Sequence, residues 1–189
     1  MRIKSSIFAV SLLALSLTLG ACSNDNGDMK MDKQEMKDEG MNHEGMMHSG
    51  SGEVPKDLKK AENPKYEVGS EAIIEADHMK GMKGAKAKIA GAFDTNAFVV
   101  TYTPTSGGDP VKNHKWVIKE EIQDAGNKEL KKGDKVTLNA DHMKGMKGAS
   151  AVIESAEKTT VYMVDYTPAT GGDTVKNHKW VTESELQPE

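Results

Sequence analysis

A-D-H-M-K-G-M-K-G-A occupies residues 76–85 and returns unchanged at residues 140–149. A second string, V-K-N-H-K-W-V, stands at residues 111–117 and again at 175–181, with the same offset of 64 positions. A fixed internal period without gaps indicates two copies of one structural unit. Each copy carries a His-Met-x-x-Met cluster and one further His, so any chemistry of this cluster is present twice.

Agreement between the two copies is uneven. Residues 86–102 agree with residues 150–166 at only 6 of 17 positions, although the strings on both sides are identical. A recent duplication alone would leave the copies uniformly similar, so the identical strings are constrained together. Two explanations stay open: glycine turns with a buried Trp, or a shared ligand site.

Apolar alternation in the second copy predicts short strands near residues 136–140, 149–153, 162–166 and 175–181. Gly-Gly-Asp after Thr-Pro indicates a turn between the last two strands, and a helical turn is expected before a short final strand. Short strands with glycine turns are typical of small closed barrels, and this order resembles an SH3-like barrel. The sequence therefore predicts a mainly β protein with two tandem SH3-like β-barrels, at residues 66–124 and 129–189.

The N-terminus has the pattern of an export signal at residues 1–21. Its apolar core, residues 7–19, is too short to span a bilayer as a helix. Leu-Gly-Ala-Cys at its end resembles a bacterial lipobox, which implies that Cys22 is lipidated. Two acyl chains suffice for stable anchoring, so we expect a lipid-anchored protein on the extracytoplasmic face of the cell membrane. The alternative is an ordinary secretory signal with a chance Cys.

Composition argues against several classes of function. Cys22 is the only Cys, so its lipidation leaves no thiol for a disulfide, a zinc-thiolate site or a nucleophile. Without Arg2 and Lys4 the mature chain has 23 basic and 29 acidic residues, a net charge of −6, which does not suit nucleic acid. The sequence contains no G-x-S-x-G, H-E-x-x-H or P-loop motif, and we expect no enzymatic activity.

Residues 22–65 are expected to form a disordered tail, because they lack the apolar surface that would offset their ordering entropy. Such a tail has no core for Met to fill, yet it holds six of the 12 Met, with two His beside them in M-N-H-E-G-M-M-H at 41–48. Thioethers and imidazoles are copper ligands. The alternative is a spacer with incidental Met. The predicted tail ligands are Met41, His43, Met46, Met47 and His48.

The folded repeats offer a second set of soft ligands on the loop between their first two strands and on their fourth strand. Met thioethers favour Cu(I) over Cu(II), and Asp77 or Asp141 is expected to orient a ring nitrogen. The predicted ligands are His78, Met79, Met82 and His114 in the first copy, and His142, Met143, Met146 and His178 in the second.

Two other interpretations of these residues stay open. The Met side chains could plug the barrel ends and the His of N-H-K-W could be structural, with Trp116 and Trp180 in the core. Alternatively, Trp, Tyr and Lys form a groove that docks on cell-wall glycan, peptide or a partner protein.

Together the two motifs resemble the YdhK family of bacterial lipoproteins, whose repeated domain of unknown function has the pattern A-D-H-M-x-G-M-x-G-A followed by N-H-K-W-V. Both copies match, at residues 76–85 with 113–117 and at 140–149 with 177–181. The resemblance implies a lipid anchor on the outer face of a membrane, typically of a Gram-positive cell. Some related surface lipoproteins are associated with copper resistance, so we expect copper sequestration that contributes to copper tolerance.

Overall fold

A computed structural model describes residues 49–189 of the chain. The predicted signal peptide, Cys22 and the tail ligands at positions 41–48 lie outside the described residues. Each repeat contributes a short strand, a 17-residue strand, an eight-residue strand and a 3-10 turn. The elements are β1 (Lys59–Lys60), β2 (Glu71–Ile74), β3 (Lys86–Tyr102), β4 (Val111–Ile118), η1 (Lys119–Glu121), β5 (Lys135–Thr137), β6 (Ser150–Tyr166), β7 (Val175–Thr182), η2 (Glu183–Glu185) and β8 (Leu186–Pro188).

The prediction of a mainly β protein is confirmed, and η2 followed by β8 confirms the helical turn before a short last strand. Two strands expected separately, near 149–153 and 162–166, are instead the two ends of β6. The residues between them look too polar for a buried strand. They nevertheless continue the ladder, because β6 pairs with β3 along its whole length, with Lys158 opposite Asn96.

The antiparallel pairing of β3 with β6 organises the sheet. Its register runs from Ala87 opposite Tyr166 to Tyr102 opposite Ala151, so the start of one long strand meets the end of the other. The strand order is β5-β6-β3-β2-β8, with β1 and β4 also on β3 and β7 also on β6. This sheet is open, and the finer prediction of closed SH3-like barrels is not confirmed.

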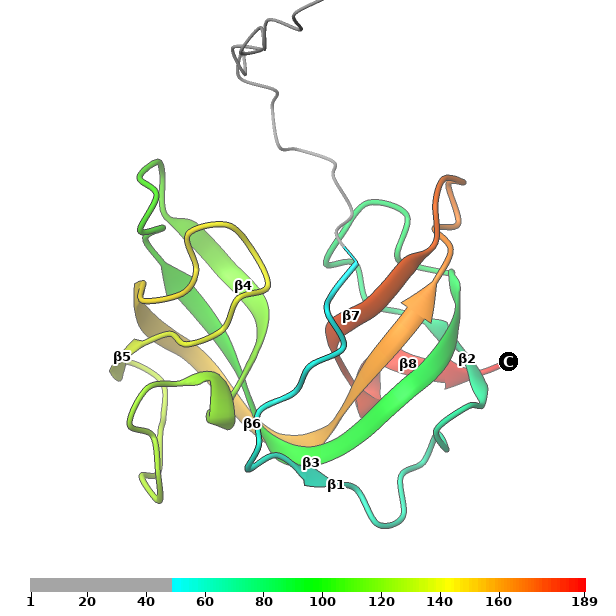
Figure 1. The fold of residues 1–189 in the computed structure, drawn as a ribbon, viewed down its shortest axis with the longest axis horizontal. Coiled ribbons are helices and arrows are strands. Elements are labelled where there is room, and N and C mark those ends of the chain that lie inside the picture. Colours follow the sequence, from blue (N-terminus) through cyan, green and yellow to red (C-terminus); the bar gives the residue numbers. More distant parts are fainter. Residues whose placement is uncertain (1–48) are drawn as a thin grey trace, which may run out of the picture. The chain divides into compact units, whose positions relative to one another are not determined.

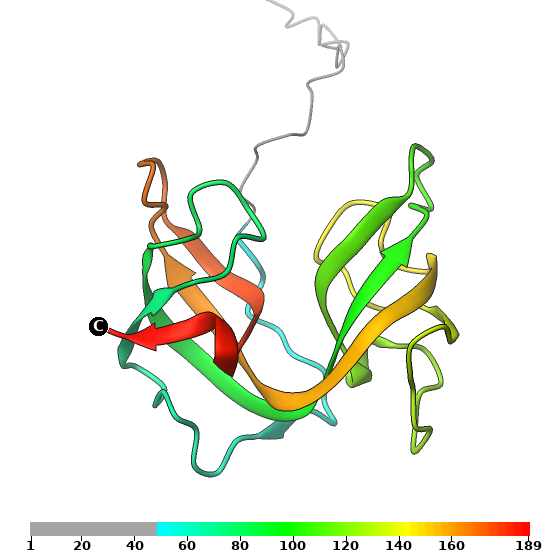
Figure 2. The ribbon, with the colours of Figure 1, turned by 180° about the vertical axis from the view of Figure 1, so that it is seen from behind.

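The packing units do not follow the sequence repeats. One core joins residues 66–92 of the first repeat to residues 162–186 of the second, and we call this the first lobe. The other core joins residues 98–125 to residues 130–153, the second lobe. Figures 1 and 2 show β3 and β6 passing through both lobes. Each lobe therefore contains the first half of one repeat and the second half of the other.

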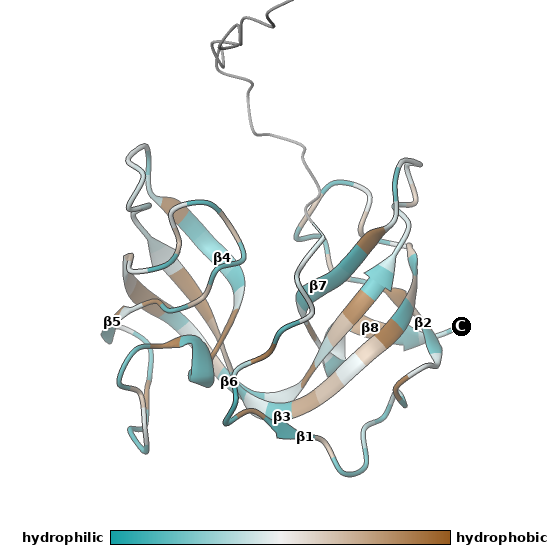
Figure 3. Ribbon diagram, viewed as in Figure 1, coloured by the Kyte–Doolittle hydropathy of each residue, from teal (hydrophilic) through white to brown (hydrophobic). Residues whose placement is uncertain are grey.

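A third apolar cluster forms where β3 and β6 cross from one lobe to the other. It contains both indoles, and Trp180 is fully buried with its ring 5.7 Å from that of Phe93 in an edge-to-face contact. Such aromatic pairs contribute about 0.5–1.5 kcal/mol beyond their area burial. Along β3 and β6, hydrophobic residues, brown in Figure 3, are interspersed with polar ones, and residues 157–160 of β6 are all polar. Within residues 49–189, no helix has the length and apolar character needed to cross a membrane.

Candidate metal site

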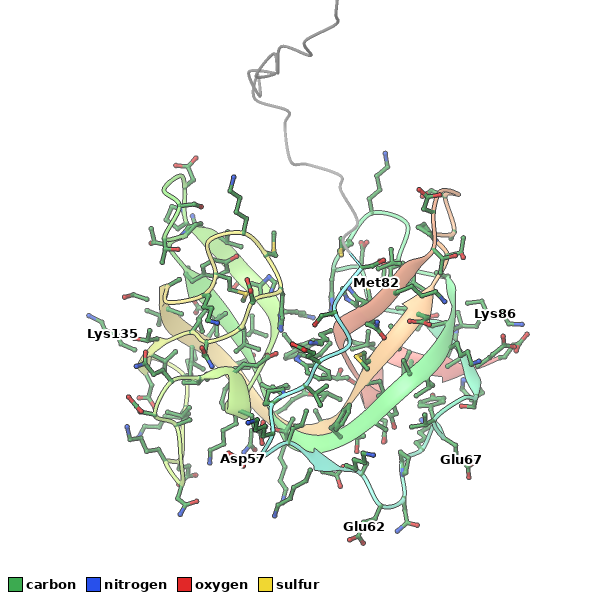
Figure 4. The ribbon with its side chains drawn as sticks, viewed as in Figure 1. Asp57, Glu62, Glu67, Met82, Lys86 and Lys135 are labelled. Atoms are coloured by element: carbon green, nitrogen blue, oxygen red, sulfur yellow. The ribbon has the colours of Figure 1, made fainter. Side chains whose placement is uncertain are left out.

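The loop of the first identical string lies between β2 and β3, and its second copy lies between β5 and β6. In the first copy, Met82 anchors the loop: its side chain is fully buried in the first lobe (Figure 4), and its amide donates to the Met79 carbonyl at 3.1 Å. Gly84, at φ +77°, donates to the Ile74 carbonyl at 2.7 Å. Met146 has the same two roles, core anchor and amide donor, in the second copy. The loop is therefore a fixed turn that presents His78 and Met79.

The other repeat also holds each loop. The carbonyl of Gly81 accepts a hydrogen bond from the Ala169 amide at 2.8 Å, and Gly145 accepts one from Thr105 at the same distance. Gly145 has φ +78°, and a Cβ there would lie 2.5 Å from Ser106 Oγ. Because L side chains avoid this backbone conformation and space is lacking as well, the glycine is required at this position.

A carboxylate from the other repeat orients each loop histidine. His78 Nε2 lies 2.7 Å from Glu185 Oε1, and His142 Nε2 lies 2.7 Å from Glu121 Oε1. A carboxylate accepts here, so Nε2 carries a proton, and in the neutral form of the ring Nδ1 presents its lone pair. The predicted orienting residues, Asp77 and Asp141, are exposed instead. The sequence argument missed both glutamates, although they occupy matching positions in the two repeats.

The same two carboxylates also accept hydrogen bonds from the indoles. Trp116 Nε1 donates to Glu185 Oε2 at 2.7 Å, and Trp180 Nε1 donates to Glu121 Oε2 at 3.1 Å. Burial of Glu185 opposes its ionisation, but hydrogen bonds from His78, the Thr182 amide and Trp116 outweigh burial and lower the pKa to about 2. Both oxygens of each carboxylate thus accept hydrogen bonds. The role of the glutamates is therefore to hold the imidazoles in place.

The second histidine of each repeat lies on an irregular part of β4 or β7. Asn113 and Asn177 have φ +52°, a left-handed conformation that Asn tolerates better than most residues, and the pairing register shifts beside them. His114 then packs edge-on against Tyr102, and His178 against Tyr166, each with ring centroids 5.8 Å apart. The local irregularity directs both imidazoles toward the loop histidines.

Four imidazole nitrogens are buried and have no hydrogen-bond partner within the described residues. They are Nδ1 of His78 and His142 and Nε2 of His114 and His178. The rings of His114 and His142 lie 6.2 Å apart in the second lobe, and His178 and His78 are their repeat-equivalents in the first lobe. Each lobe therefore pairs one free Nδ1 from the loop with one free Nε2 from the strand.

Both strand histidines are neutral at pH 7. Burial, reinforced by the neighbouring histidines, lowers the pKa of His114 to about 4 and that of His178 to about 3. A neutral imidazole is the form that binds metal, because a protonated nitrogen has no lone pair to donate. These side chains are therefore in a ligand-competent state over the whole physiological range of pH.

Each loop also carries a thioether, Met79 or Met143, next in sequence to its histidine. Met143 Sδ is 3.9 Å from Tyr102 Oη, on the tyrosine against which His114 packs. Met79 occupies the matching loop position in the first lobe and is half-buried against its core. The described residues contain no group of three or more His, Cys, Asp or Glu side chains able to hold a metal. A third donor in either lobe would accordingly be sulfur, in a His–His–Met set.

Other predicted residues lie elsewhere. Met82 and Met146 are fully buried in the lobe cores, where they pack among apolar side chains. Trp116 and Trp180 are only 5% and 0% exposed. They therefore lie in the central cluster and not in an open surface groove.

The sequence pattern of the family described as "Protein of unknown function (DUF1541)" matches residues 68–119 and 132–183. The chain belongs to this family, and both repeats are copies of its domain. It is also 58% identical to "Uncharacterized protein YdhK" of Bacillus subtilis (strain 168), over 98% of this chain and 91% of the relative.

Solved structures of ydhK from B. subtilis share the fold. The crystal structure of a DUF1541 family protein (ydhK) at 2.00 Å resolution has 65% identity and a TM-score of 0.74, over 78% of this chain and all of that one. The solution structure of the ydhK C-terminal domain has 67% identity and a TM-score of 0.62, over 65% of this chain and 93% of that one.

Proposed function

We propose that this protein is a lipid-anchored, extracytoplasmic copper-binding protein that contributes to copper tolerance by sequestration. The carrying observation is the set of four buried imidazole nitrogens that lack a hydrogen-bond partner within residues 49–189. An unsatisfied buried polar group costs about 1–3 kcal/mol. Because four such atoms lie at matched positions of the two repeats, we interpret them as ligand atoms and not as packing defects.

The chemistry of the donor set supports Cu(I). Each lobe offers two imidazoles and a thioether without any thiol, and soft thioethers select Cu(I), while imidazoles suit copper in general. The nearest carboxylates, Glu121 and Glu185, already accept hydrogen bonds from His, Trp and backbone amide groups. They orient the imidazoles from outside the ligand shell, which disfavours ions such as Mg²⁺ or Ca²⁺ that require oxygen ligands.

A competition titration of Cu(I) against a chromophoric chelator tests this proposal. The protein is the chain without residues 1–22, and the changes are His114→Ala and His178→Ala. We expect each variant to lose one tightly bound Cu(I) and the double variant to lose two. Equal stoichiometry in all four proteins would refute binding at the folded sites.

Matched methionine variants sharpen the titration. Met143→Leu removes a proposed ligand, and we expect it to weaken Cu(I) binding in the second lobe about tenfold, or 1.4 kcal/mol. Met146→Leu changes the same side chain in the core three residues away and conserves volume, so it should leave affinity unchanged. If both variants weaken binding alike, the thioether of Met143 is not a ligand.

The cellular part of the proposal rests on the lipobox-like sequence that ends at Cys22. A strain that carries the double His114→Ala, His178→Ala variant in place of the wild type is expected to stop growing at a lower copper concentration. Retention of the protein on purified peptidoglycan, independent of copper, would favour the rival function, an SH3-like module that docks on the cell wall.

A further inference from the structure

Each proposed copper site combines a loop histidine, a strand histidine and a thioether, and we name the sites by their lobes. The first-lobe site is His78, His178 and Met79, and the second-lobe site is His142, His114 and Met143. The strand that carries each strand histidine has an indole two residues further on, Trp116 in β4 and Trp180 in β7. These two strands come close to each other where the lobes meet (Figure 1), and both indoles are buried there. The contacts of the indoles therefore decide whether the sites are independent.

The indole of the second-lobe strand supports the first-lobe site. Trp116 Nε1 donates to Glu185 Oε2 at 2.7 Å, and the other oxygen of this carboxylate lies 2.7 Å from His78 Nε2. The Trp116 ring also meets the His78 ring edge-on, with centroids 6.4 Å apart. Lys115, the residue between His114 and Trp116, places its Nζ 3.5 Å from Glu185 Oε1. The strand that carries His114 thus holds the loop histidine of the other site.

The indole of the first-lobe strand makes the reciprocal contact. Trp180 Nε1 donates to Glu121 Oε2 at 3.1 Å, and Glu121 Oε1 lies 2.7 Å from His142 Nε2. Lys179, the residue before this indole, donates instead to the Glu53 carbonyl. Support in this direction is therefore weaker, because the hydrogen bond is longer and no lysine of the strand joins it within residues 49–189. Each loop histidine is nevertheless oriented, through one carboxylate, by the strand of the other site.

Both carboxylates are also held by their own lobe. The Ile118 amide donates to Glu121 Oε2 at 3.2 Å, and the Thr182 amide donates to Glu185 Oε2 at 3.1 Å. The indole N–H is an additional restraint on a carboxylate that its own lobe already anchors. Among these hydrogen bonds, only the one from the indole passes between the lobes.

We propose that each indole is a positioning residue for the copper site of the other lobe, and that the two sites consequently bind Cu(I) cooperatively. This inference rests on the proposed function. Copper on His114 restrains β4 and with it Trp116, so that Glu185 and His78 lose less freedom when the first-lobe site is filled. A ligand that has already ordered a shared element lowers the cost of ordering for the next ligand, and such coupling acts equally in both directions.

Single-site proteins separate the two directions. In the chain without residues 1–22, His114→Ala leaves the first-lobe site and His178→Ala leaves the second-lobe site. Each background receives Trp116→Phe or Trp180→Phe, which keeps a ring in the central cluster but removes the N–H donor. Cu(I) affinity is measured by chelator competition. Residues 23–48 are the same in all of these proteins, so copper bound by them contributes equally.

We expect a crossed pattern. Trp116→Phe should weaken the first-lobe site about tenfold and the second-lobe site less than about twofold, in line with the effect of losing a partner that orients a metal ligand. It should do so although Trp116 lies two residues from a ligand of the second-lobe site. Trp180→Phe should weaken only the second-lobe site, and by a smaller factor because its hydrogen bond is longer.

Two further measurements keep the test independent of folding defects and of copper. Circular dichroism checks each variant, and β-(3-benzothienyl)alanine, which has the shape of tryptophan with sulfur in place of the N–H, replaces any phenylalanine that prevents folding. In the metal-free protein with both sites, nitrogen-15 spectra of the imidazoles should show a change at His78 with Trp116→Phe and at His142 with Trp180→Phe.

The protein with both sites tests the coupling itself. We expect its second Cu(I) to bind at least about fivefold more tightly than the two single-site proteins predict, which is the lower end of typical coupling between sites. The double variant Trp116→Phe, Trp180→Phe should abolish this gain.

Three results would overturn the inference and leave the proposed function standing. Equal losses at both sites from each phenylalanine variant would reduce the indoles to packing residues. Losses confined to the site on the same strand would show that no support passes between the lobes. Independent binding of two Cu(I) ions in the protein with both sites would refute the coupling. Absence of Cu(I) binding in both single-site backgrounds, before any change of Trp, would instead overturn the proposed function together with this inference.

Discussion

The two lobes begin from the same strings of sequence and end as different environments. In the first lobe β8 pairs with β2, and the chain at Ser49 and Gly50 is hydrogen-bonded to Lys176 of β7. In the second lobe the chain leaves the sheet after a single bridge from Ile122 to Leu138, and a groove lined by Ala125, Leu130 and Val136 opens where a last strand would pair. Identical motifs therefore form the same local turns in both lobes, whereas the order of the elements along the chain decides which segments cover these turns.

A second difference lies in the middle of the long strands, where the repeats diverge. Phe93 packs edge-on against Trp180, but the repeat-equivalent of Phe93 is Glu157. The pKa of Glu157 is raised, by burial first and by the charge of Glu185 second. Trp180 thus has a phenylalanine neighbour from the long strand, whereas the corresponding position for Trp116 is a partly buried carboxyl, and the ring beside Trp116 is that of His78 at 6.4 Å.

Replacing Trp116 or Trp180 should give the largest losses of stability. Trp180→Ala is expected to lower the free energy of unfolding by about 4 kcal/mol, because it opens a cavity between the lobes. Trp116→Ala should cost about 1 kcal/mol less, since its edge-to-face contact with the His78 ring, at 6.4 Å, is longer than the 5.7 Å contact between Trp180 and Phe93. Urea denaturation of both variants measures the difference. Equal losses would show that the contact with Phe93 adds no more to stability than the contact with His78.

Removing the carboxylate of Glu121 or Glu185, each of which accepts hydrogen bonds from a His and a Trp, should give the next largest loss of stability. Glu121→Ala leaves His142 Nε2, Trp180 Nε1 and the Ile118 amide without their acceptor, and we expect a loss of about 2–3 kcal/mol. Glu185→Ala should cost less, because the Glu185 side chain is 13% exposed against 7% for Glu121 and water can replace it more easily. Thermal unfolding of both, with the exposed Glu129→Ala as control, checks this order.

Acid should destabilise the metal-free protein through the strand histidines. The pKa of His178 is lowered to about 3 and that of His114 to about 4, while the unfolded chain has ordinary values near 6.5. Between these values the unfolded state binds more protons, so stability falls as the pH drops from about 6.5 toward 4. At pH 5 the loss is roughly 1–2 kcal/mol for each histidine.

Denaturation curves at pH 7 and pH 5, in the presence of a chelator, measure this loss. The double variant His114→Phe, His178→Phe should flatten the pH dependence in this window. An unchanged slope in the double variant would assign the acid sensitivity to other groups. Glu185 loses its hydrogen bonds only at lower pH, because its pKa is about 2.

Most of the local structure could be predicted from the sequence, but little of the long-range arrangement could. Glycines, the Thr-Pro turn and apolar alternation predicted the loop of residues 76–85 and the strand that became β7, because these features act over a few residues. The cross-pairing of Ala87 with Tyr166 was not predictable in this way. Two repeats with matching strands can pair within a copy or between copies, and the local pattern is the same in both cases.

In the candidate site, too, local features could be predicted from the sequence and contacts between the repeats could not. Composition and spacing singled out the four histidines whose buried ring nitrogens lack a hydrogen-bond partner within residues 49–189, because imidazole next to thioether is unusual in a polar chain. Glu121 and Glu185 were missed, since each acts on a histidine of the other repeat. Met82 and Met146 were predicted as ligands on spacing alone, but their side chains, three positions after Met79 and Met143, point into the lobe cores.

The smallest expected change in stability is at position 157, and there the substitution should stabilise the protein. Glu157→Phe installs beside Trp116 the ring that Phe93 provides beside Trp180, and it removes a carboxyl that burial already disfavours. We expect stabilisation by about 1 kcal/mol from the new aromatic contact, measured by urea denaturation. Glu157→Gln removes the charge without adding a ring and separates the two causes. Destabilisation by Glu157→Phe would mean that the space beside Trp116 is already filled, so that the central cluster is asymmetric in shape as well as in sequence. In that case the divergence of residues 86–102 from 150–166 reflects packing of the central cluster, while the proposed metal sites would account for the identity of the two strings.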